Sequence, residues 1–589
     1  MNFQHPIYTA RNECQDCCAC LRNCPVKAIR VENGSAMVMP ERCLACGNCV
    51  KVCPVHAKRV RDDVGRLRQL LRSGRRVVAS LAPSYVSEFA GLTPAQMVRS
   101  LKQLGFAAVS ETALGAQEVS AAVAADLRAD PTPRILLSSA CPVVVDLVYK
   151  YLPRYGHLVT NLASPALAHC RLLRREFGDD IAVVFIGPCI AKKLEADRHP
   201  ELLDLAVTFA DLRRCLDEAG INPRTVATEA DDVFVPQPAQ EGALYPVDGG
   251  MIAGIKANCT VHDAGFMALS GVENVRRGLR DLEEVRLTRP LFLELLGCEG
   301  GCINGPQTEE QAATVVKRLR VVEQAPYPQD EVPRAASVET RLDRRLDPIE
   351  EPVFSEQQIH AALERIGKHG LDDELNCGGC GYAGCREFAQ ALLAGTAETT
   401  SCISYMRKLA QKKANALIQA MPSGVVIVDQ DLNVVECNRR FAEILGPEVV
   451  EVFDARPGME GAILERVAPF LAKFFRQVLQ NGGDILYRDI KHDGRVFTTS
   501  VISIEAGRVA GAILRDITEP AVQRDQIIRQ AQSVIRQQMK TVQKIAYLLG
   551  ENAAESQVSL NAIIESFSQG GSDGDDKDDK ASKDSSHGR

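Results

Sequence analysis

The chain has 589 residues, of which 46% are hydrophobic and 25% charged, with a formal net charge of −7 and a pI near 5.9. A single hydrophobic core stops growing near ~250–300 residues, so this length predicts several domains. Lysine and arginine are scattered rather than clustered, which gives no electrostatic footprint for nucleic acid, and we expect no nucleic-acid partner.

Cysteine usage indicates the compartment. Most of the 21 cysteines are grouped at C-x2-C spacings. In a chain that shows no signal peptide, this pattern favours metal ligation in a reducing cytosol over disulfides. No apolar run reaches the ~18–20 residues that span a bilayer. We therefore expect a cytoplasmic protein with no membrane partner.

Two cysteine runs open the chain, each with the spacing C-x2-C-x2-C-x3-C-P. Thiolates at this spacing wrap a 4Fe-4S cubane, and in two-cluster ferredoxins the fourth cysteine of each run binds the other cluster. The runs therefore predict a two-cluster ferredoxin domain, with zinc as the weaker alternative. One cluster would be held by Cys14, Cys17, Cys20 and Cys53, and the other by Cys43, Cys46, Cys49 and Cys24.

From about residue 65 the pattern changes to alternating strands and helices, which is typical of an α/β fold. Helical stretches such as 95–104 and 117–127 are interleaved with short apolar runs. These runs predict buried strands at residues 77–81, 107–109, 135–137 and 182–186.

Four further cysteines lie in this region. Cys141 stands in S-S-A-C-P and Cys189 in G-P-C-I-A-K-K-L-E, each where a buried parallel strand would end and a loop begin, the usual place for a site in an α/β fold. Cys298 and Cys302 are separated by E-G-G, and glycines beside paired thiols allow a backbone to pass close to an inorganic cluster. We expect the four thiolates to converge on one cluster.

These segments, in this order, resemble the signature loops of the iron-only (di-iron) hydrogenases over roughly residues 65–330. In that family four cysteines hold a cubane, and the last also bridges to a two-iron unit that carries carbonyl, cyanide and dithiolate ligands; the whole is the H-cluster. The resemblance implies that Cys302 is the bridge and that the other cubane ligands are Cys141, Cys189 and Cys298. The plainer alternative is an ordinary cubane or a set of core cysteines.

Three more positions refine the resemblance. Lys192 and Glu195 match the family's lysine and glutamate, and the lysine donates a hydrogen bond to a cyanide there. Where catalytic members carry a second cysteine that passes protons to the two-iron unit, this chain has Ala140. The acidic residue that those enzymes place upstream in the relay is also missing here, because the matching region 118–127 has only alanines, valines and a serine near the expected position. Losing a positioned acid–base group typically costs ~10²–10⁴-fold in rate, so we predict slow turnover; the alternative is another route for protons.

A third cysteine group follows a connector rich in proline and charge. Its spacing is C-x2-C-x4-C-x16-C, with four glycines among the first three cysteines. The group resembles the small iron–sulfur domain of several redox proteins, which implies a third 4Fe-4S cluster, and zinc is the alternative. The ligands would be Cys377, Cys380, Cys385 and Cys402.

The next module changes character. Residues 424–429, 432–438 and 440–446 indicate strand, strand and short helix, and later strands are predicted at 489–491, 496–502 and 509–514. With its asparagine before the first helix and its closing D-I-T, the module resembles a PAS sensory domain. Such domains bind small ligands or dimerise. Nothing at Cys437 or elsewhere indicates a haem or flavin ligand, which favours a ligand-free PAS domain.

The last part predicts a helix whose apolar residues, from Ile535 and Met539 onward, alternate in steps of four and three, the seam of a coiled coil. The alternative is packing against the PAS domain. A polar tail predicts disorder.

The sequence thus predicts a multidomain chain of α/β and α+β modules. Its parts are a two-cluster ferredoxin domain (1–62), an H-cluster domain (63–330), a linker (331–349), a 4Fe-4S domain (350–408), a PAS domain (409–519), a signalling helix (520–569) and a disordered tail (570–589).

The leading functional hypothesis from this set of parts is a sensory iron-only hydrogenase. Hydrogen would be split, or protons reduced, slowly and reversibly, and the redox signal would pass through the 4Fe-4S clusters to the PAS domain. Expected partners are a ferredoxin or other redox carrier, a kinase or phosphatase downstream as the resemblance implies, and a second copy through the PAS domain and C-terminal helix. The alternatives are a catalytic ferredoxin-linked hydrogenase and a non-catalytic iron–sulfur scaffold without the di-iron unit.

Overall fold

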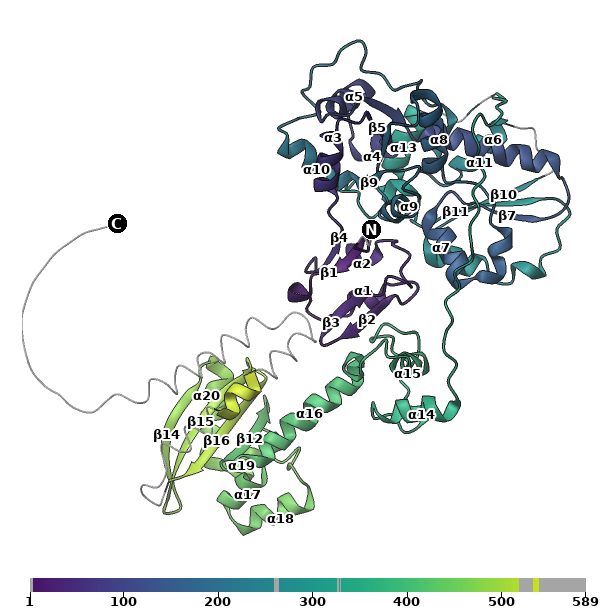
Figure 1. Cartoon of the computed structure of the whole chain (residues 1–589). Helices are drawn as coiled ribbons and strands as arrows, with labels where there is room; N and C mark the ends of the chain where they lie inside the picture. The colour runs from purple at the N-terminus through teal and green to yellow at the C-terminus, as the bar shows by residue number, and fades with distance from the viewer. Residues whose placement is uncertain (1–3, 259–263, 326–327, 329, 518–532, 540–589) are drawn as a thin grey trace, which may run out of the picture. The chain divides into compact units, whose positions relative to one another are not determined.

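The computed structural model of the chain describes residues 4–258, 264–325, 328, 330–517 and 533–539 (Figure 1). It divides into two compact units, residues 1–402 and 403–589. A helix is predicted over 520–569, and the structure describes residues 533–539 of it, which are helical. The tail predicted over 570–589 lies outside the described residues.

The first domain of unit 1 is an internal repeat. Antiparallel pairs join β1 (Ile7–Thr9) to β4 (Lys58–Val60) and β2 (Ile29–Glu32) to β3 (Ser35–Val38), and a short helix follows within each cysteine run, α1 (Ala19–Arg22) and α2 (Asn48–Lys51). Residues 29 positions apart share the left-handed backbone conformation: Cys18 and Gly47 have φ of 55° and 81°, and Lys27 and His56 have φ of 50° and 52°. The two halves therefore fold alike, as the repeated spacing predicts.

The larger domain is built on two parallel sheets. The first has the order β6 (Ala108–Glu111), β5 (Val77–Leu81), β8 (Ala182–Gly187), β9 (Leu205–Thr208), and the second has the order β10 (Gly265–Ser270), β11 (Leu291–Leu296), β7 (Ile135–Leu137). All residues of β5, β8 and β11 are buried, which is expected for parallel strands covered on both faces.

The four strands predicted in this region are confirmed within two residues at each end, whereas the sequence patterns do not assign β9, β10 and β11. The predicted helices are also found, as α5 (Pro94–Gln103) and α6 (Ala113–Ala129). The other helices are α3 (Val64–Leu71), α4 (Tyr85–Glu88), α7 (Pro142–Tyr151), α8 (Pro165–Phe177), α9 (Ala191–Arg198), α10 (Phe209–Glu218), α11 (Gly250–Asn258), α12 (Val272–Gly278) and α13 (Thr314–Gln324).

A small helical domain closes unit 1. α14 (Glu356–Glu364) packs on α15 (Cys385–Leu393). A capping box starts α14, in which the Ser355 hydroxyl accepts a hydrogen bond from the Gln358 backbone N–H. Among the described residues of the whole chain, no helix combines the length and the apolar character needed to cross a membrane.

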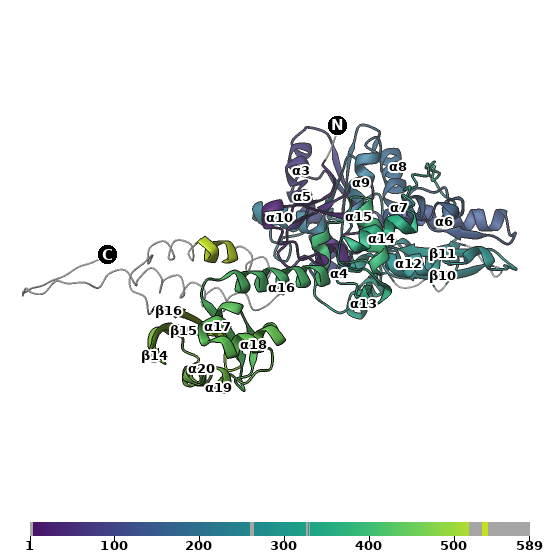
Figure 2. The same cartoon turned by 90° about the horizontal axis from the view of Figure 1, so that it is seen from below.

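Unit 2 begins with α16 (Ile403–Ala420) and continues as an antiparallel five-stranded sheet. The sheet order is β13 (Val434–Cys437), β12 (Gly424–Asp429), β16 (Val509–Asp516), β15 (Arg495–Glu505), β14 (Ile485–His492). Its helices are α17 (Arg439–Leu445), α18 (Pro447–Ala455), α19 (Leu464–Val467) and α20 (Pro469–Asn481). α17 and α18 lie side by side in both views (Figure 1, Figure 2).

Asn438 shows why an asparagine precedes α17. Its side-chain oxygen accepts hydrogen bonds from the backbone N–H groups of Val425 (2.8 Å) and Phe441 (3.0 Å), and its amide donates to the carbonyl oxygens of Ile418 (2.9 Å) and Ser423 (2.8 Å). One fully buried side chain thus caps α17 and fastens the end of α16 to the sheet.

Candidate active site and cluster sites

Four thiols meet where the strands of the larger domain end. Cys141 caps α7 just after β7, Cys189 lies between β8 and α9, and Cys298 and Cys302 follow β11. Burial raises the pKa of the Cys302 thiol, and the thiols of Cys141 and Cys189 raise it further; the Cys298 thiol responds in the same way to the other three. Segments up to 161 residues apart are therefore brought together, as the sequence predicts.

The surroundings of these thiols fit an iron–sulfur group. The Gly297 N–H donates to Cys141 Sγ at 3.4 Å, and such N–H···S contacts support anionic sulfur at a cluster. Gly301, with φ of +96°, has no room for a side chain, because a Cβ there would lie 2.2 Å from the Pro246 carbonyl oxygen. This glycine is thus required by chain packing, in addition to any approach to a cluster.

Lys192 lies in the first turn of α9 and is held by two side chains. Its ammonium donates to Ser164 Oγ at 2.9 Å and to Glu195 Oε2 at 2.5 Å, and the Ser164 hydroxyl donates to the same carboxylate oxygen at 3.0 Å. All three residues are buried. The ammonium also favours the ionised form of Cys189 and Cys302, since it lowers the pKa of both thiols against the effect of burial. Ser164 has no sequence signal beyond its position as the N-cap of α8.

Glu294 is a second residue that the sequence analysis does not assign. It lies on β11 with 1% of its surface exposed, and the Ile252 N–H donates to its Oε2 at 3.1 Å, while Oε1 has no well-formed hydrogen bond. Burial raises the pKa of this carboxyl to about 7, and the Cys302 thiol interacts with it. A single charge inside the apolar run L-F-L-E-L-L is the signal that could have identified it.

The ferredoxin cysteines gather in the sets that the spacing predicts for one cluster. Burial raises the pKa of the Cys43 thiol to about 12, with Cys46 and Cys24 adding to the effect, and the Cys49 thiol interacts with the same three. Backbone N–H groups donate to sulfur in both halves, from Ala28 to Cys24 Sγ (3.2 Å), from Ala36 to Cys14 Sγ (3.5 Å) and from Ala45 to Cys43 Sγ (3.3 Å).

Three of the four cysteines predicted for the other ferredoxin cluster also lie close together. Burial raises the pKa of the Cys20 thiol to about 11, and Cys14 and Cys17 contribute to the increase. Cys53 is buried. The Cys46 thiol in turn interacts with Cys189, so the cluster set of Cys24, Cys43, Cys46 and Cys49 lies beside the four-thiol site.

The third predicted set is also brought together. Burial raises the pKa of the Cys380 thiol, and the neighbouring thiols of Cys402 and Cys377 contribute. Cys385 is buried at the start of α15, where its N–H donates to Asn376 Oδ1 at 2.7 Å. Within the part of the chain that the structure describes, no three histidine, cysteine or acidic side chains form the tight group that a single metal ion needs.

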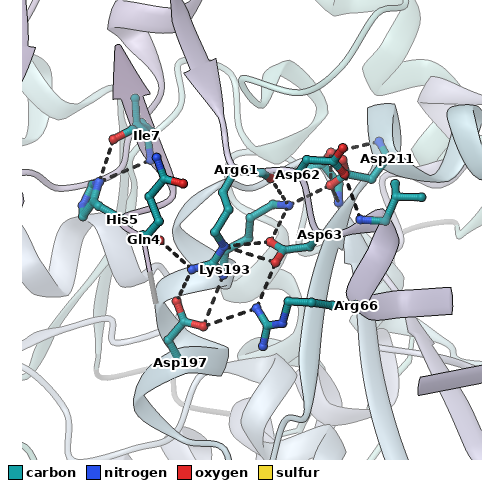
Figure 3. A network of polar contacts seen from close by, with 12 residues as sticks. Gln4, His5, Ile7, Arg61, Asp62, Asp63, Arg66, Lys193, Asp197 and Asp211 are labelled. Atoms are coloured by element: carbon teal, nitrogen blue, oxygen red, sulfur yellow. Dashed lines mark hydrogen bonds and ion pairs between the residues drawn. The ribbon is translucent and has the colours of Figure 1, made fainter. Parts of the chain in front are cut away.

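A buried ion network lies between the ferredoxin domain and the larger domain (Figure 3). Lys193, next to Lys192 on α9, is fully buried and donates to Arg61 O (2.9 Å), Asp63 Oδ2 (2.9 Å) and Asp211 Oδ2 (2.8 Å). Burial alone would raise the pKa of Asp63, but Lys193 and Arg61 outweigh it and hold that pKa below its usual value. The network fastens the start of α9 to the end of the ferredoxin domain.

Comparison with known protein families agrees with this geometry. Residues 75–306 match the model for the iron only hydrogenase large subunit, C-terminal domain, and residues 36–59 match the 4Fe-4S binding domain. Residues 373–404 match a model for an Fe-S cluster domain, and residues 413–482 match a PAS domain. The larger domain thus belongs to the iron-only hydrogenases. The chain thus combines this hydrogenase-like domain with a ferredoxin-like N-terminal region, an additional iron–sulfur domain and a PAS domain.

Two solved structures are similar to parts of the chain. A variant of FeFe hydrogenase HydA1 from Chlamydomonas reinhardtii is 19% identical and is matched over 47% of this chain and 91% of that chain, with a TM-score of 0.36. The PAS domain of an HTR-like protein from Haloarcula marismortui is 19% identical over 19% of this chain and 99% of that chain, with a TM-score of 0.14. A comparison with curated proteins gives no match.

Proposed function

We propose that this protein is a sensory iron-only hydrogenase, in which hydrogen is split or protons are reduced slowly and reversibly. The observation that carries the proposal is the convergence of the four thiols of Cys141, Cys189, Cys298 and Cys302 beside the Lys192 ammonium. When bound, the H-cluster would supply the iron at which hydrogen reacts. Cys302 would join its two parts, and the other three cysteines would complete the cubane.

Lys192 is suited to bind a ligand of the di-iron unit. An ammonium has three N–H donors. Two are used by Ser164 and Glu195, which fix its position, so one remains for an acceptor such as a cyanide nitrogen. A buried cation held in this way stabilises anionic ligands without having to reorganise.

Proton delivery distinguishes the sensory proposal from its catalytic alternative. The methyl group of Ala140 cannot carry a proton, which supports slow turnover. Glu294, however, has a carboxyl pKa of about 7, so it can gain and lose a proton at neutral pH. This carboxyl favours the second candidate, a hydrogenase that turns over through another proton route and exchanges electrons with a ferredoxin.

The proposed signal leaves through the third cluster site. Cys402 is the last residue of unit 1, and α16 of unit 2 begins at the next residue. Since Asn438 fastens the other end of α16 to the PAS sheet, a change at Cys402 would reach that sheet along one helix. We propose that a kinase or phosphatase reads the PAS domain.

Infrared spectroscopy of the matured full-length protein tests the active site. We expect carbonyl and cyanide bands that change under hydrogen. Cys302→Ser should abolish the bands, whereas Cys215→Ser, which alters a buried thiol on α10 away from the predicted ligands, should retain them. A fully loaded protein without these bands would support the iron–sulfur scaffold alternative, and bands that hydrogen leaves unchanged would refute sensing.

Turnover at substrate saturation separates the two hydrogenase candidates. The sensory proposal expects a rate ~10²–10⁴-fold below that of fast catalytic hydrogenases, because a positioned proton donor is missing. A rate equal to that of fast enzymes would establish the catalytic alternative.

A further inference from the structure

The two halves of the ferredoxin repeat contact different neighbours through equivalent residues. In the second half, the Lys51 ammonium donates to the Asn304 carbonyl oxygen at 2.7 Å, two residues after Cys302. A Cβ at Gly47 would lie 2.3 Å from Pro306 Cβ, so the backbone before α2 is pressed against the same loop. This half of the repeat therefore docks on the four-thiol site.

The first half makes the corresponding contacts with the third cysteine group. Arg22, which stands 29 residues before Lys51, donates from Nη1 to the Gly379 carbonyl oxygen at 3.3 Å, between Cys377 and Cys380. A Cβ at Gly381 would lie 3.0 Å from the Arg22 backbone nitrogen. Glu398 Oε1 accepts a hydrogen bond from the Asn33 N–H at 2.9 Å, which adds a second point of contact.

Lys27 lies between the ferredoxin cysteine Cys24 and the third cysteine group. It lines a cavity of about 1420 Å³ together with Cys24, Tyr382 and Glu387. Its ammonium donates to two carbonyl oxygens at the end of α1, each at 3.4 Å. Burial lowers the pKa of Lys27, while the thiols of Cys24 and Cys380 both favour its charged form. Because the repeat has a histidine at the equivalent position 56, a lysine ammonium here is specific to the half that contacts the third group.

We propose that the ferredoxin domain relays single electrons between the active-site cubane and the third cluster, and that Lys27 is a positioning residue whose charge raises the reduction potentials of the two clusters on either side of it. A reduced cluster carries one more negative charge than an oxidised one, so a fixed cation favours the reduced form of each. An electron leaving the cluster of Cys24 would reduce the cluster of Cys380 and change no bond. The proposal rests on the proposed cluster occupancy and is independent of hydrogen chemistry.

Redox titration followed by electron paramagnetic resonance tests the role of Lys27 in the full-length protein with all 4Fe-4S clusters loaded. Cys402→Ser identifies the signal of the third cluster. In Lys27→Gln we expect two midpoint potentials to become more negative, that of the third cluster and that of one ferredoxin cluster. Arg30→Gln, which removes an exposed cation paired with Glu32, should move neither. A shift confined to the ferredoxin cluster would overturn the shared position of Lys27.

A second pair of variants tests the docking itself. Gly381→Val should push the third domain away from Arg22 and remove the spin–spin broadening between the two reduced clusters. Gly370→Val changes a glycine of the same domain that has no atom within 4 Å of its Cβ position, so the broadening should persist. Persistent broadening in a fully loaded Gly381→Val protein would refute the docking. Should that variant lose iron, the Lys27→Gln titration decides alone.

These measurements need no di-iron unit and no hydrogen. Missing carbonyl and cyanide bands would therefore refute the proposed function and leave the relay standing. Unchanged potentials in Lys27→Gln would refute the role of Lys27, and persistent broadening in Gly381→Val would refute the docking, and both results would leave the function standing.

Discussion

Replacing Lys193 by methionine tests whether the buried ion network holds the hydrogenase domain to the ferredoxin domain. The substitution removes three hydrogen bonds, to Asp63 Oδ2, Asp211 Oδ2 and the Arg61 carbonyl oxygen, at a side chain with no exposed surface. Methionine fills a similar volume, so the main effect is the loss of the charge and not a cavity.

The expected loss follows from the carboxylates left behind. Removing one partner of a buried ion pair typically costs ~3–5 kcal/mol, because the other charge is left uncompensated. Asp63 still receives hydrogen bonds from Arg61 and Arg66, and Asp211 still accepts from the Thr208 N–H and hydroxyl. The remaining partners place the expected loss at the lower end, about 3 kcal/mol of unfolding free energy.

Urea denaturation of full-length protein, followed by far-ultraviolet circular dichroism, measures this loss. The control is Arg30→Met, which breaks an ion pair whose two side chains are about half exposed (46% and 48%) and should cost no more than ~1 kcal/mol. Equal losses in the two variants would show that the buried network contributes no more than an exposed pair, and the reasoning from burial would fail.

Three further predictions concern the site. Ala140→Cys should raise turnover at least ~10-fold if the missing thiol limits proton delivery, and an unchanged rate would exclude that cause. Wild-type stability should decline between about pH 4.5 and 7, because over this window the folded chain holds a proton on Glu294 that the unfolded chain has lost. Glu294→Gln removes this titration, so the variant should be more stable than wild type at pH 8 by up to about 3 kcal/mol in urea denaturation. Below pH 4.5 the two proteins should be equally stable. Gly47→Ala should slow electron transfer from the ferredoxin clusters in stopped-flow reduction, because its Cβ would overlap Pro306, whereas Gly34→Ala, with open space around it, should not.

The sequence can propose cluster ligands because thiolate spacing is a local property. The cysteine runs, the parallel strands β5 and β7 and the position of Cys141 after a strand can all be read from short segments. It does not assign β9, β10 and β11, although β11 carries two of the proposed ligands at its end. The apolar run before Cys298 fits a buried strand or a buried helix, and only pairing with β7 and β10 decides between them.

The sequence does not predict the role of residues that depend on neighbours elsewhere in the fold. Ser164 is an ordinary helix cap until folding brings Lys192 and Glu195 to it. Glu294 is a charge in an apolar strand until its position relative to Cys302 is known. Neither relation follows from spacing, because the contacting segments are separated by 28 residues or by a cluster-binding loop.

The two halves of the ferredoxin repeat share some residues and differ in others, and the differences lie at contacts with other parts of the chain. The cysteine spacing and the left-handed backbone positions are common to both halves, since each half must wrap a cubane. The halves differ where they meet other parts of the chain. Gly47 of the second half lies against the active-site loop, whereas the equivalent Cys18 of the first half faces the third domain. Lys27 of the first half is likewise replaced by His56 in the second. The shared residues are thus those that a cluster would require, and the differing residues distinguish the two contacts. A symmetric electron carrier needs no such differences, so their coincidence with the two interfaces supports the proposed relay between two different neighbours.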